Sequence, residues 1–239
     1  MTATLSNRVV MITGATGALG SVVTRVFAHT EAQLALVSTS AEKLAELADE
    51  AGLPEERVFT AAGDLTQPEE VDAVVDAVVD HFGGLDVLLN TVGGWSGGVP
   101  VHQTTPGAWR RALDLNLNSA FFLSQAVLPP MLEGGWGRVV HVGSKTALDV
   151  KAKQAGYAVA KMGLITLTGV IAAEVKGTGV TANVILPSII DTPANRKMMS
   201  RADPSRWVSP EAIAAAMRFL CSDEAASING DRLRIYGQV

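Results

Sequence analysis

The chain has only one cysteine and no excess of positive charge. Cys221 has no second cysteine to pair with, which excludes an internal disulfide and is typical of a protein in a reducing compartment. Acidic side chains outnumber basic ones by 24 to 19, which gives a formal net charge of -5. No broad basic surface is therefore available to nucleic acid or to an anionic membrane. We expect a cytoplasmic protein that binds neither, with Cys221 as a small buried hydrophobe.

Uninterrupted hydrophobic runs and clustered metal ligands are also missing. The longest mainly apolar segment, residues 157–175, is interrupted by Lys161 and Glu174, which predicts a buried helix rather than a membrane span. The N-terminal residues lack the charged-then-apolar pattern of a signal sequence. The 4 histidines lie far apart and share no ligand spacing with Cys, Asp or Glu, so we expect no metal site.

Apolar sequence, in contrast, is abundant. Hydrophobic residues make up 48% of the chain and charged residues 18%, which predicts a well-buried core. Short runs of Val, Leu and Ile alternate with helical patterns, and their near-continuous apolar content is typical of strands that helices cover on both faces. The predicted strands are Val9–Ile12, Leu34–Val37, Val58–Ala61, Val87–Leu89, Val139–Val142, Val180–Leu186 and Leu233–Ile235.

Helices are predicted between these strands. Ser40, Thr66 and Ser209 each precede a helical segment, as residues that cap helix N-termini do. Repeated strand–helix units require parallel pairing and right-handed crossovers, so we predict a doubly wound α/β fold with seven mostly parallel strands and helices on both faces. No linker divides residues 1–239, which are expected to form one domain. The predicted helices are Ala18–His29, Ala41–Ala51, Glu69–Phe82, Pro106–Met131, Ala155–Lys176 and Pro210–Leu220.

A glycine-rich loop joins the first predicted strand to the first predicted helix. Its glycines let the backbone turn sharply and approach a pyrophosphate, whose charge the helix N-terminus would hold. The position of this loop favours dinucleotide binding, as in Rossmann-type sheets, over a purely structural turn. The residues expected to contact the cofactor here are Gly14, Thr16, Gly17, Ala18, Leu19 and Gly20.

The end of the second predicted strand bears on the choice of cofactor. An acidic residue there would bind the ribose 2′-hydroxyl of NAD and repel a 2′-phosphate. This chain has Ser38, Thr39 and Ser40 instead, and three hydroxyls neither repel nor neutralise that phosphate. Both cofactors remain open, with NADP(H) slightly favoured over NAD(H).

Tyr157 and Lys161, a phenol and an ammonium four residues apart, are the first candidate catalytic residues. Tyr157 and Lys161 lie on one face of a predicted helix, where the positive charge is expected to lower the tyrosine pKa from about 10. The phenol would then exchange a proton with a substrate oxygen near neutral pH. Ser144 follows the fifth predicted strand, at the sheet edge where α/β proteins bind ligands. Its hydroxyl would donate to a carbonyl oxygen as charge develops. Asn116 lies inside a predicted helix and alone would read as an ordinary polar residue.

Together these residues resemble the short-chain dehydrogenase/reductase family in its single-domain form, from about residue 8 to 237. The resemblance implies one dinucleotide-binding and catalytic domain that interconverts a carbonyl and a secondary alcohol on a small organic substrate by hydride transfer. It implies that Tyr157 is the proton donor or acceptor and that Ser144 binds the substrate oxygen. Lys161 would lower the tyrosine pKa and hold the nicotinamide ribose, and Asn116 would anchor a water relay behind Lys161.

Further cofactor contacts follow from the same resemblance. Asp64 matches an adenine-binding acid, Asn90 supports the central sheet, and the segment from Pro187 lies over the nicotinamide, with Thr192 near the pyrophosphate. Three positions depart from the family pattern, namely Ala18, Thr91 and Ser188. The contacts implied beyond the glycine-rich loop are Asp64, Leu65, Asn90, Val92, Gly93, Tyr157, Lys161, Pro187, Ile189 and Thr192.

Two alternatives to carbonyl reduction stay open. The segment Gly93–Gly98 and the residues around Thr192 are similar to dihydropteridine reductases, which reduce a quinonoid pterin. A non-catalytic NAD(P)-binding regulator is a second alternative, although such proteins generally lose the tyrosine or lysine. Trp95 is a candidate for the substrate pocket, and Met198 and Met199 for a flexible lid. In this family the helix matching residues 155–176 pairs with its copy, so a homodimer or homotetramer is expected.

Overall fold

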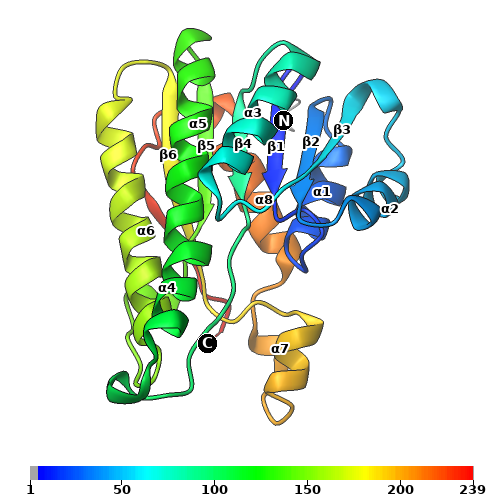
Figure 1. Ribbon diagram of the computed structural model, residues 1–239. Helices are drawn as coiled ribbons and strands as arrows, with labels where there is room; N and C mark the ends of the chain where they lie inside the picture. Colours follow the sequence, from blue (N-terminus) through cyan, green and yellow to red (C-terminus); the bar gives the residue numbers. More distant parts are fainter. Residues whose placement is uncertain (1–4, 239) are drawn as a thin grey trace.

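The computed structural model describes residues 5–238 and has a parallel seven-stranded sheet at its centre (Figure 1). The strand order is β3-β2-β1-β4-β5-β6-β7, and every neighbouring pair is parallel. The predicted doubly wound α/β fold is confirmed, with an all-parallel rather than a mostly parallel sheet. The strands are β1 (Val9–Thr13), β2 (Gln33–Ser38), β3 (Val58–Ala62), β4 (Val87–Asn90), β5 (Gly137–Val142), β6 (Val180–Pro187) and β7 (Arg232–Ile235).

Helices cover both faces of this sheet because alternate strand residues point to opposite sides. On one face α1, α2 and α8 pack on side chains such as Ile12 and Leu36; on the other, α3, α5 and α6 pack on side chains such as Met11 and Leu88. The helices are α1 (Gly20–Ala28), α2 (Ala41–Ala51), α3 (Pro68–Phe82), α4 (Pro106–Leu113), α5 (Ser119–Glu133), α6 (Ala155–Glu174), α7 (Pro193–Met198) and α8 (Pro210–Leu220).

Two of the three predicted helix caps are confirmed. The Ser40 hydroxyl accepts a hydrogen bond from the Lys43 amide, and the Ser209 hydroxyl accepts one from Ala212. The prediction for Thr66 was wrong. Its amide and hydroxyl both donate to Asp64 Oδ1, and α3 begins beyond it at Pro68. A local turn around the carboxylate therefore replaces the cap.

The long helix predicted over residues 106–131 is interrupted. After α4 the chain makes a π-helical turn, Asp114–Asn118, before α5 continues from Ser119. A π-helical turn inserts one residue into the helical repeat and turns the following side chains toward a new direction. Asn116 lies within it and is 2% exposed, so this interruption carries a polar side chain into the interior.

One described helix, α6, is long and apolar enough to cross a membrane by length and composition alone. Its most hydrophobic window has a mean hydropathy of 1.5, and 50% of that window is buried inside the fold. A core helix of a soluble protein meets the same criterion. The buried half packs against β5 and β6, as predicted for a core helix.

The sheet directs its carboxyl ends toward one side of the molecule. In Figure 1 the strand arrows point to the bottom of the view, where α7 stands apart from the layered body and the C-terminus lies nearby. The loops after β1, β4, β5 and β6 all arrive at this edge because parallel strands end together. Residues far apart in the sequence therefore meet there.

Candidate active site

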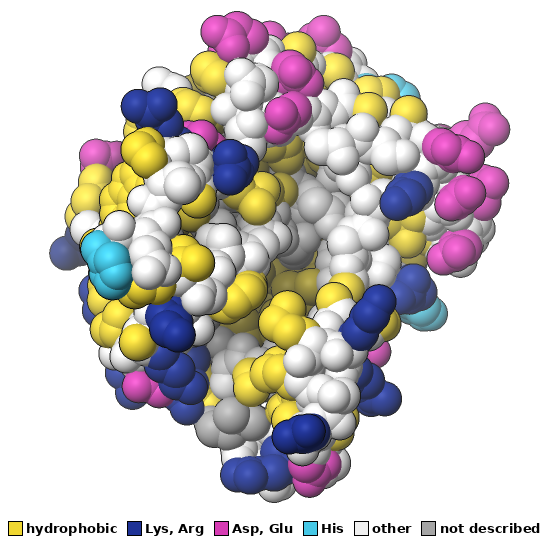
Figure 2. Space-filling view, turned by 60° about the horizontal axis from the view of Figure 1, so that its bottom comes forward, with side chains coloured by type: hydrophobic (Ala, Val, Ile, Leu, Met, Phe, Trp, Pro, Cys, Tyr) yellow, Lys and Arg dark blue, Asp and Glu magenta, His cyan; other side chains and the backbone are white. Residues whose placement is uncertain are grey.

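A cavity of about 560 Å³ opens at the carboxyl ends of the strands. It is lined by the loops after β1, β4, β5 and β6, the start of α6, and α7. Figure 2 looks onto this face and shows the hollow walled mainly by hydrophobic and uncharged atoms. Ser144, Tyr157 and Lys161 all line the cavity, so three of the four predicted catalytic residues share one space.

Ser144 and Tyr157 form the reacting end of this cavity. Ser144 follows β5 and is 7% exposed, and its hydroxyl accepts a 3.1 Å hydrogen bond from the Thr146 amide. Burial raises the pKa of Tyr157, and a side-chain hydrogen bond with Ser144 partly opposes that rise. The prediction that Lys161 lowers this pKa was wrong for the structure described. Desolvation of the phenolate outweighs the favourable contacts.

Lys161 is held behind these hydroxyls. Its Nζ atom donates a 2.8 Å hydrogen bond to the carbonyl oxygen of Val142, the last residue of β5, and the side chain is 3% exposed. Burial lowers the pKa of Lys161 to about 8 because the charged form loses its hydration. An anionic or hydroxyl-bearing ligand in the cavity would restore part of that lost solvation.

Asn116 does not line the cavity but reaches its wall through Gly94. Its Oδ1 atom accepts a 3.1 Å hydrogen bond from the Gly94 amide, and its Nδ2 atom donates to the carbonyl oxygens of Gly94 and Ala112. A Cβ atom at Gly93 would lie 3.0 Å from both Asn116 Oδ1 and Lys161 Nζ. The loop after β4 therefore packs between the side chains of Asn116 and Lys161. Glycine at position 93, which has no Cβ atom, leaves space for both side chains.

The glycine-rich loop fits a pyrophosphate. Gly14 has φ +69°, a conformation that favours glycine, and a Cβ atom at Gly20 would lie 2.1 Å from the Gly14 carbonyl oxygen. Among the described residues no side chain caps the N-terminus of α1, and its first turn contains no acidic residue. Backbone N–H groups at such a terminus attract an anion. Gly17, Ala18, Leu19 and Gly20 line the cavity, although α1 begins at Gly20 rather than at Ala18 as predicted.

The residues expected at the adenosine end lie outside the cavity lining. Thr16 Oγ1 and Ser38 Oγ are 2.6 Å apart, which joins the glycine-rich loop to the end of β2. Thr39 is exposed, and Ser40 caps α2. Asp64 is exposed, with Oδ1 occupied by Thr66, and the neighbouring Leu65 is 5% exposed.

Asn90 ends β4 and belongs to a buried chain of hydrogen bonds. Its Oδ1 atom accepts from the Thr13 hydroxyl and the Val92 amide, and its Nδ2 atom lies 3.2 Å from His141 Nδ1. His141 Nε2 lies 3.2 Å from the Ser124 hydroxyl, which donates to a backbone carbonyl. Asn90 therefore donates to Nδ1, and His141 carries its proton on Nε2. Burial, reinforced by Lys161, lowers the pKa of His141 to about 3, so the ring is neutral.

Comparison with known proteins decides the family. A family model described as short chain dehydrogenase matches residues 8–203. The chain belongs to the short-chain dehydrogenase family. It is an NAD(P)-dependent oxidoreductase of the kind that interconverts carbonyl and alcohol groups, as its relatives are.

Two curated relatives match almost the whole chain. The 3-oxoacyl-(acyl-carrier-protein) reductase FabG of Vibrio cholerae is 32% identical over 98% of this chain and 97% of its own length. The D-threitol dehydrogenase of Mycolicibacterium smegmatis is 32% identical over 98% of this chain and 93% of its own. A solved short-chain dehydrogenase/reductase from Mycobacterium ulcerans has a TM-score of 0.92 at 26% identity, covering 98% of this chain and 90% of the other.

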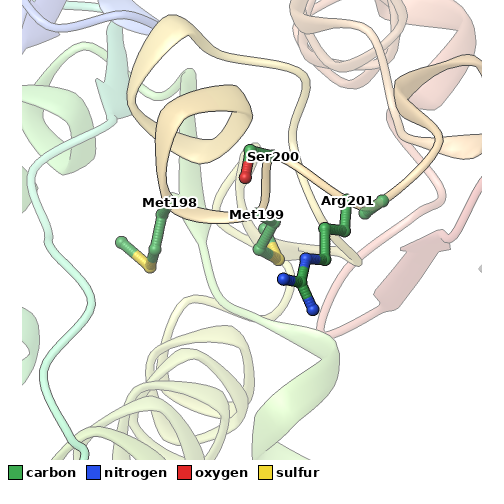
Figure 3. Close-up of a pocket in the computed structure, with 5 residues that line it drawn as sticks. Met198, Met199, Ser200 and Arg201 are labelled. Carbon is green, nitrogen blue, oxygen red and sulfur yellow. The ribbon is translucent and has the colours of Figure 1, made fainter.

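In this short-chain dehydrogenase the segment after β6 forms the other wall of the cavity. Pro187, Ile189 and Thr192 line it, and the Thr192 hydroxyl caps α7 by accepting from the Asn195 amide. Met198 and Met199, the candidates for a lid, also line the cavity. Figure 3 shows their side chains leaving the end of α7 on the same side, beside a second pocket of about 520 Å³ lined by residues 198–202.

The sequence predicted only some of the residues that line the cavity of this short-chain dehydrogenase. Trp95 was raised as a candidate and does line the cavity. Lys151 and Gln154 do so as well, and only their place shortly before Tyr157 hinted at it. His141 was weighed only as a metal ligand. Among residues 5–238 no group of three or more His, Cys, Asp or Glu side chains suits a metal ion. The lining residues not predicted are Thr91, Gly94, Val142, Gly143, Thr146, Lys151, Gln154, Ser188, Ile190, Ala194 and Asn195.

Proposed function

We propose that this enzyme reduces a carbonyl on a small organic substrate to a secondary alcohol, or runs the reverse reaction, with Tyr157 as the acid/base. One observation supports the proposal above the others. Ser144 and Tyr157 interact at a cavity that also receives the buried ammonium of Lys161, next to a loop shaped for a pyrophosphate. A hydride donor and a proton donor are the two requirements of carbonyl reduction.

Each residue has a distinct part in this proposal. The nicotinamide cofactor supplies the hydride when bound. The Tyr157 hydroxyl donates its proton to the substrate oxygen as negative charge develops there, and the Ser144 hydroxyl donates a hydrogen bond to the same oxygen. Lys161, whose pKa burial lowers to about 8, provides a donor for the nicotinamide ribose. Asn116 holds the loop at Gly94 in position. It would also anchor the water relay that returns protons to Lys161.

The cofactor is proposed to extend from the cavity across the glycine-rich loop to the end of β2. Gly14, Thr16, Gly17 and the start of α1 would hold the pyrophosphate, and Asp64 with Leu65 would lie at the adenine. The hydroxyl pair of Thr16 and Ser38 supports NADP(H) over NAD(H), because no carboxylate at that strand end repels a 2′-phosphate. The segments Asn90–Gly93 and Pro187–Thr192 would flank the nicotinamide.

The enzyme is further proposed to act as a cytoplasmic homodimer or homotetramer that binds neither nucleic acid nor membrane. Large apolar side chains remain exposed on the outer helices, at 46% for Phe121 on α5 and at 48% and 49% for Val159 and Val170 on α6. A second copy would cover them, since soluble monomers rarely expose contiguous apolar patches. The net charge of -5 supports the absence of nucleic-acid partners.

A direct assay tests the proposal. The purified protein is mixed with NADPH or NADH and with a ketone, a 3-oxoacyl thioester or a quinonoid pterin, and nicotinamide absorbance is followed. Consumption of the reduced cofactor with a carbonyl substrate is the expected result. Oxidation with the pterin alone, or no oxidation with any substrate, contradicts the proposal.

A further inference from the structure

One polar atom at the active-site cavity has no use in the reaction described so far. Among residues 5–238, three buried side-chain polar atoms lack a hydrogen-bond partner: Arg138 Nε, Thr181 Oγ1 and Gln154 Oε1. Only Gln154 lines the cavity. A buried carbonyl oxygen without a donor destabilises the fold, so an unpaired one on a residue that lines a ligand cavity points to a donor on the ligand.

Gln154 lies at the start of the helix that carries Tyr157. Gln154 is the N-cap residue of α6, and Tyr157 follows three residues later, on the neighbouring turn. The two side chains therefore come from the same end of one helix. Both residues line the cavity, so a substrate whose reacting oxygen lies at the Tyr157 hydroxyl shares that space with the Gln154 side chain.

The side chain is also held in place by the loop after β4. The Gly98 amide donates a 2.8 Å hydrogen bond to the carbonyl oxygen of Lys153, next to Gln154. A Cβ atom at Gly97 would lie 3.4 Å from Gln154 Cγ and 3.0 Å from Trp95 Cζ2. Glycine at position 97 thus lets Gln154 and Trp95 pack against one loop residue and form a single wall of the cavity.

The charges around the cavity restrict the kind of donor. Lys151 and Lys161 are the charged residues of the described lining, which contains no Asp or Glu. A cationic ammonium on the substrate would face two positive groups and no carboxylate. A neutral hydroxyl provides a donor without that repulsion.

We propose that Gln154 determines specificity by accepting a hydrogen bond from a substrate hydroxyl close to the reacting carbonyl. The preferred substrates are then α-hydroxy ketones, and in the reverse direction vicinal diols. This inference rests on the proposed function, because it takes the reacting oxygen to lie at Ser144 and Tyr157. It adds the second point of attachment that orients the substrate for hydride transfer.

Matched substrate pairs test the inference. The values of kcat/KM are measured with NADPH and with NADH for 3-hydroxybutan-2-one against butan-2-one, and for 2-hydroxycyclohexanone against cyclohexanone. The wild-type enzyme is expected to prefer the hydroxy ketone by about tenfold or more, because the plain ketone leaves Gln154 Oε1 unpaired. Equal rates within each pair overturn the inference but leave carbonyl reduction standing, whereas reduction of no ketone overturns both.

Two variants identify the atom responsible. Gln154→Leu removes the acceptor at similar size, so the preference should fall close to one. Gln154→Glu keeps carboxylate oxygens that accept, so the preference should persist. Gln103→Leu, at an exposed glutamine outside the cavity, is the matched control and should keep the wild-type ratio. An unchanged ratio in Gln154→Leu, or a ratio of one in Gln154→Glu, overturns the role as acceptor; thermal unfolding midpoints verify that the variants are folded.

Discussion

The ammonium of Lys161 donates a 2.8 Å hydrogen bond to the carbonyl oxygen of Val142, two residues before Ser144. This bond ties α6, which carries Tyr157, to the end of β5, the strand that Ser144 follows. The relative position of the Ser144 and Tyr157 hydroxyls therefore depends in part on this contact between α6 and β5. Lys161 is the positioning residue for both, in addition to any direct role toward the cofactor.

The Tyr157 hydroxyl is expected to be required for proton transfer. Tyr157→Phe removes that hydroxyl and keeps the ring, so turnover should fall by at least about a hundredfold while cofactor affinity changes little. Steady-state kcat and a fluorescence titration of NADPH measure the two effects. Tyr236→Phe alters the other tyrosine, which lies outside the cavity lining, and should leave turnover close to wild type. Retention of most activity in Tyr157→Phe would contradict the mechanism.

Acid should destabilise the enzyme through His141. Its pKa is about 6.5 in the unfolded chain and about 3 in the folded one, because burial, with Lys161 nearby, disfavours the charged ring. The unfolded state therefore binds more protons between these values, and stability falls as pH decreases from 6.5 toward 3. At pH 5 the loss relative to pH 7 is about 2 kcal/mol.

Urea unfolding of His141→Asn and the wild type at pH 7 and pH 5 checks this expectation. Asparagine cannot take up the proton, so the variant should lose less free energy of unfolding between the two pH values. The comparison uses the change with pH, and a uniform loss from repacking around Asn90 and Ser124 does not affect it. The same decline in both proteins would show that His141 is not the group responsible.

The sheet was predictable from sequence because parallel strands buried on both faces carry almost only Val, Leu and Ile. The observed β1, β5 and β6 each match a predicted run to within two residues at either end. The glycine-rich loop and the pair of Tyr157 and Lys161 were also predictable, because each is recognised from a few neighbouring residues. Their placement at one edge followed from parallel pairing alone.

The interruption at Asp114–Asn118 was not predictable, because the apolar periodicity runs on from α4 into α5. What favours the π-helical turn is tertiary: Asn116 gains three hydrogen bonds to backbone atoms, two of them to Gly94 from a distant part of the chain. The raised pKa of Tyr157 was likewise not predictable, since the sequence shows that Lys161 is four residues away but not that the phenol is buried. Both features depend on contacts that no local window contains.

The cofactor preference is expected to depend on Ser38. NADPH should bind at least as tightly as NADH, and Ser38→Asp should shift the preference toward NADH, since a carboxylate repels the 2′-phosphate and binds the 2′-hydroxyl. Titration of both cofactors against the wild type and the variant measures the shift. Ser227→Asp, which adds the same charge at an exposed site, controls for net charge. Strong preference of the wild type for NADH would contradict the assignment.

Ser144 separates carbonyl reduction from pterin reduction. When a ketone is reduced, its oxygen becomes alkoxide-like, and a fixed hydroxyl donor there is worth about 3 kcal/mol. A quinonoid pterin is reduced across a conjugated ring, so its charge is spread and no single oxygen requires that donor. Ser144→Ala should therefore lower kcat/KM for ketones by roughly a hundredfold, the rate equivalent of that energy, and spare any pterin reduction. Measuring both activities on the one variant makes each substrate the control for the other, because a folding defect would lower both. If the wild type reduces only pterins and Ser144→Ala leaves that rate unchanged, then carbonyl reduction is the wrong assignment, although the fold and the cofactor site remain as described.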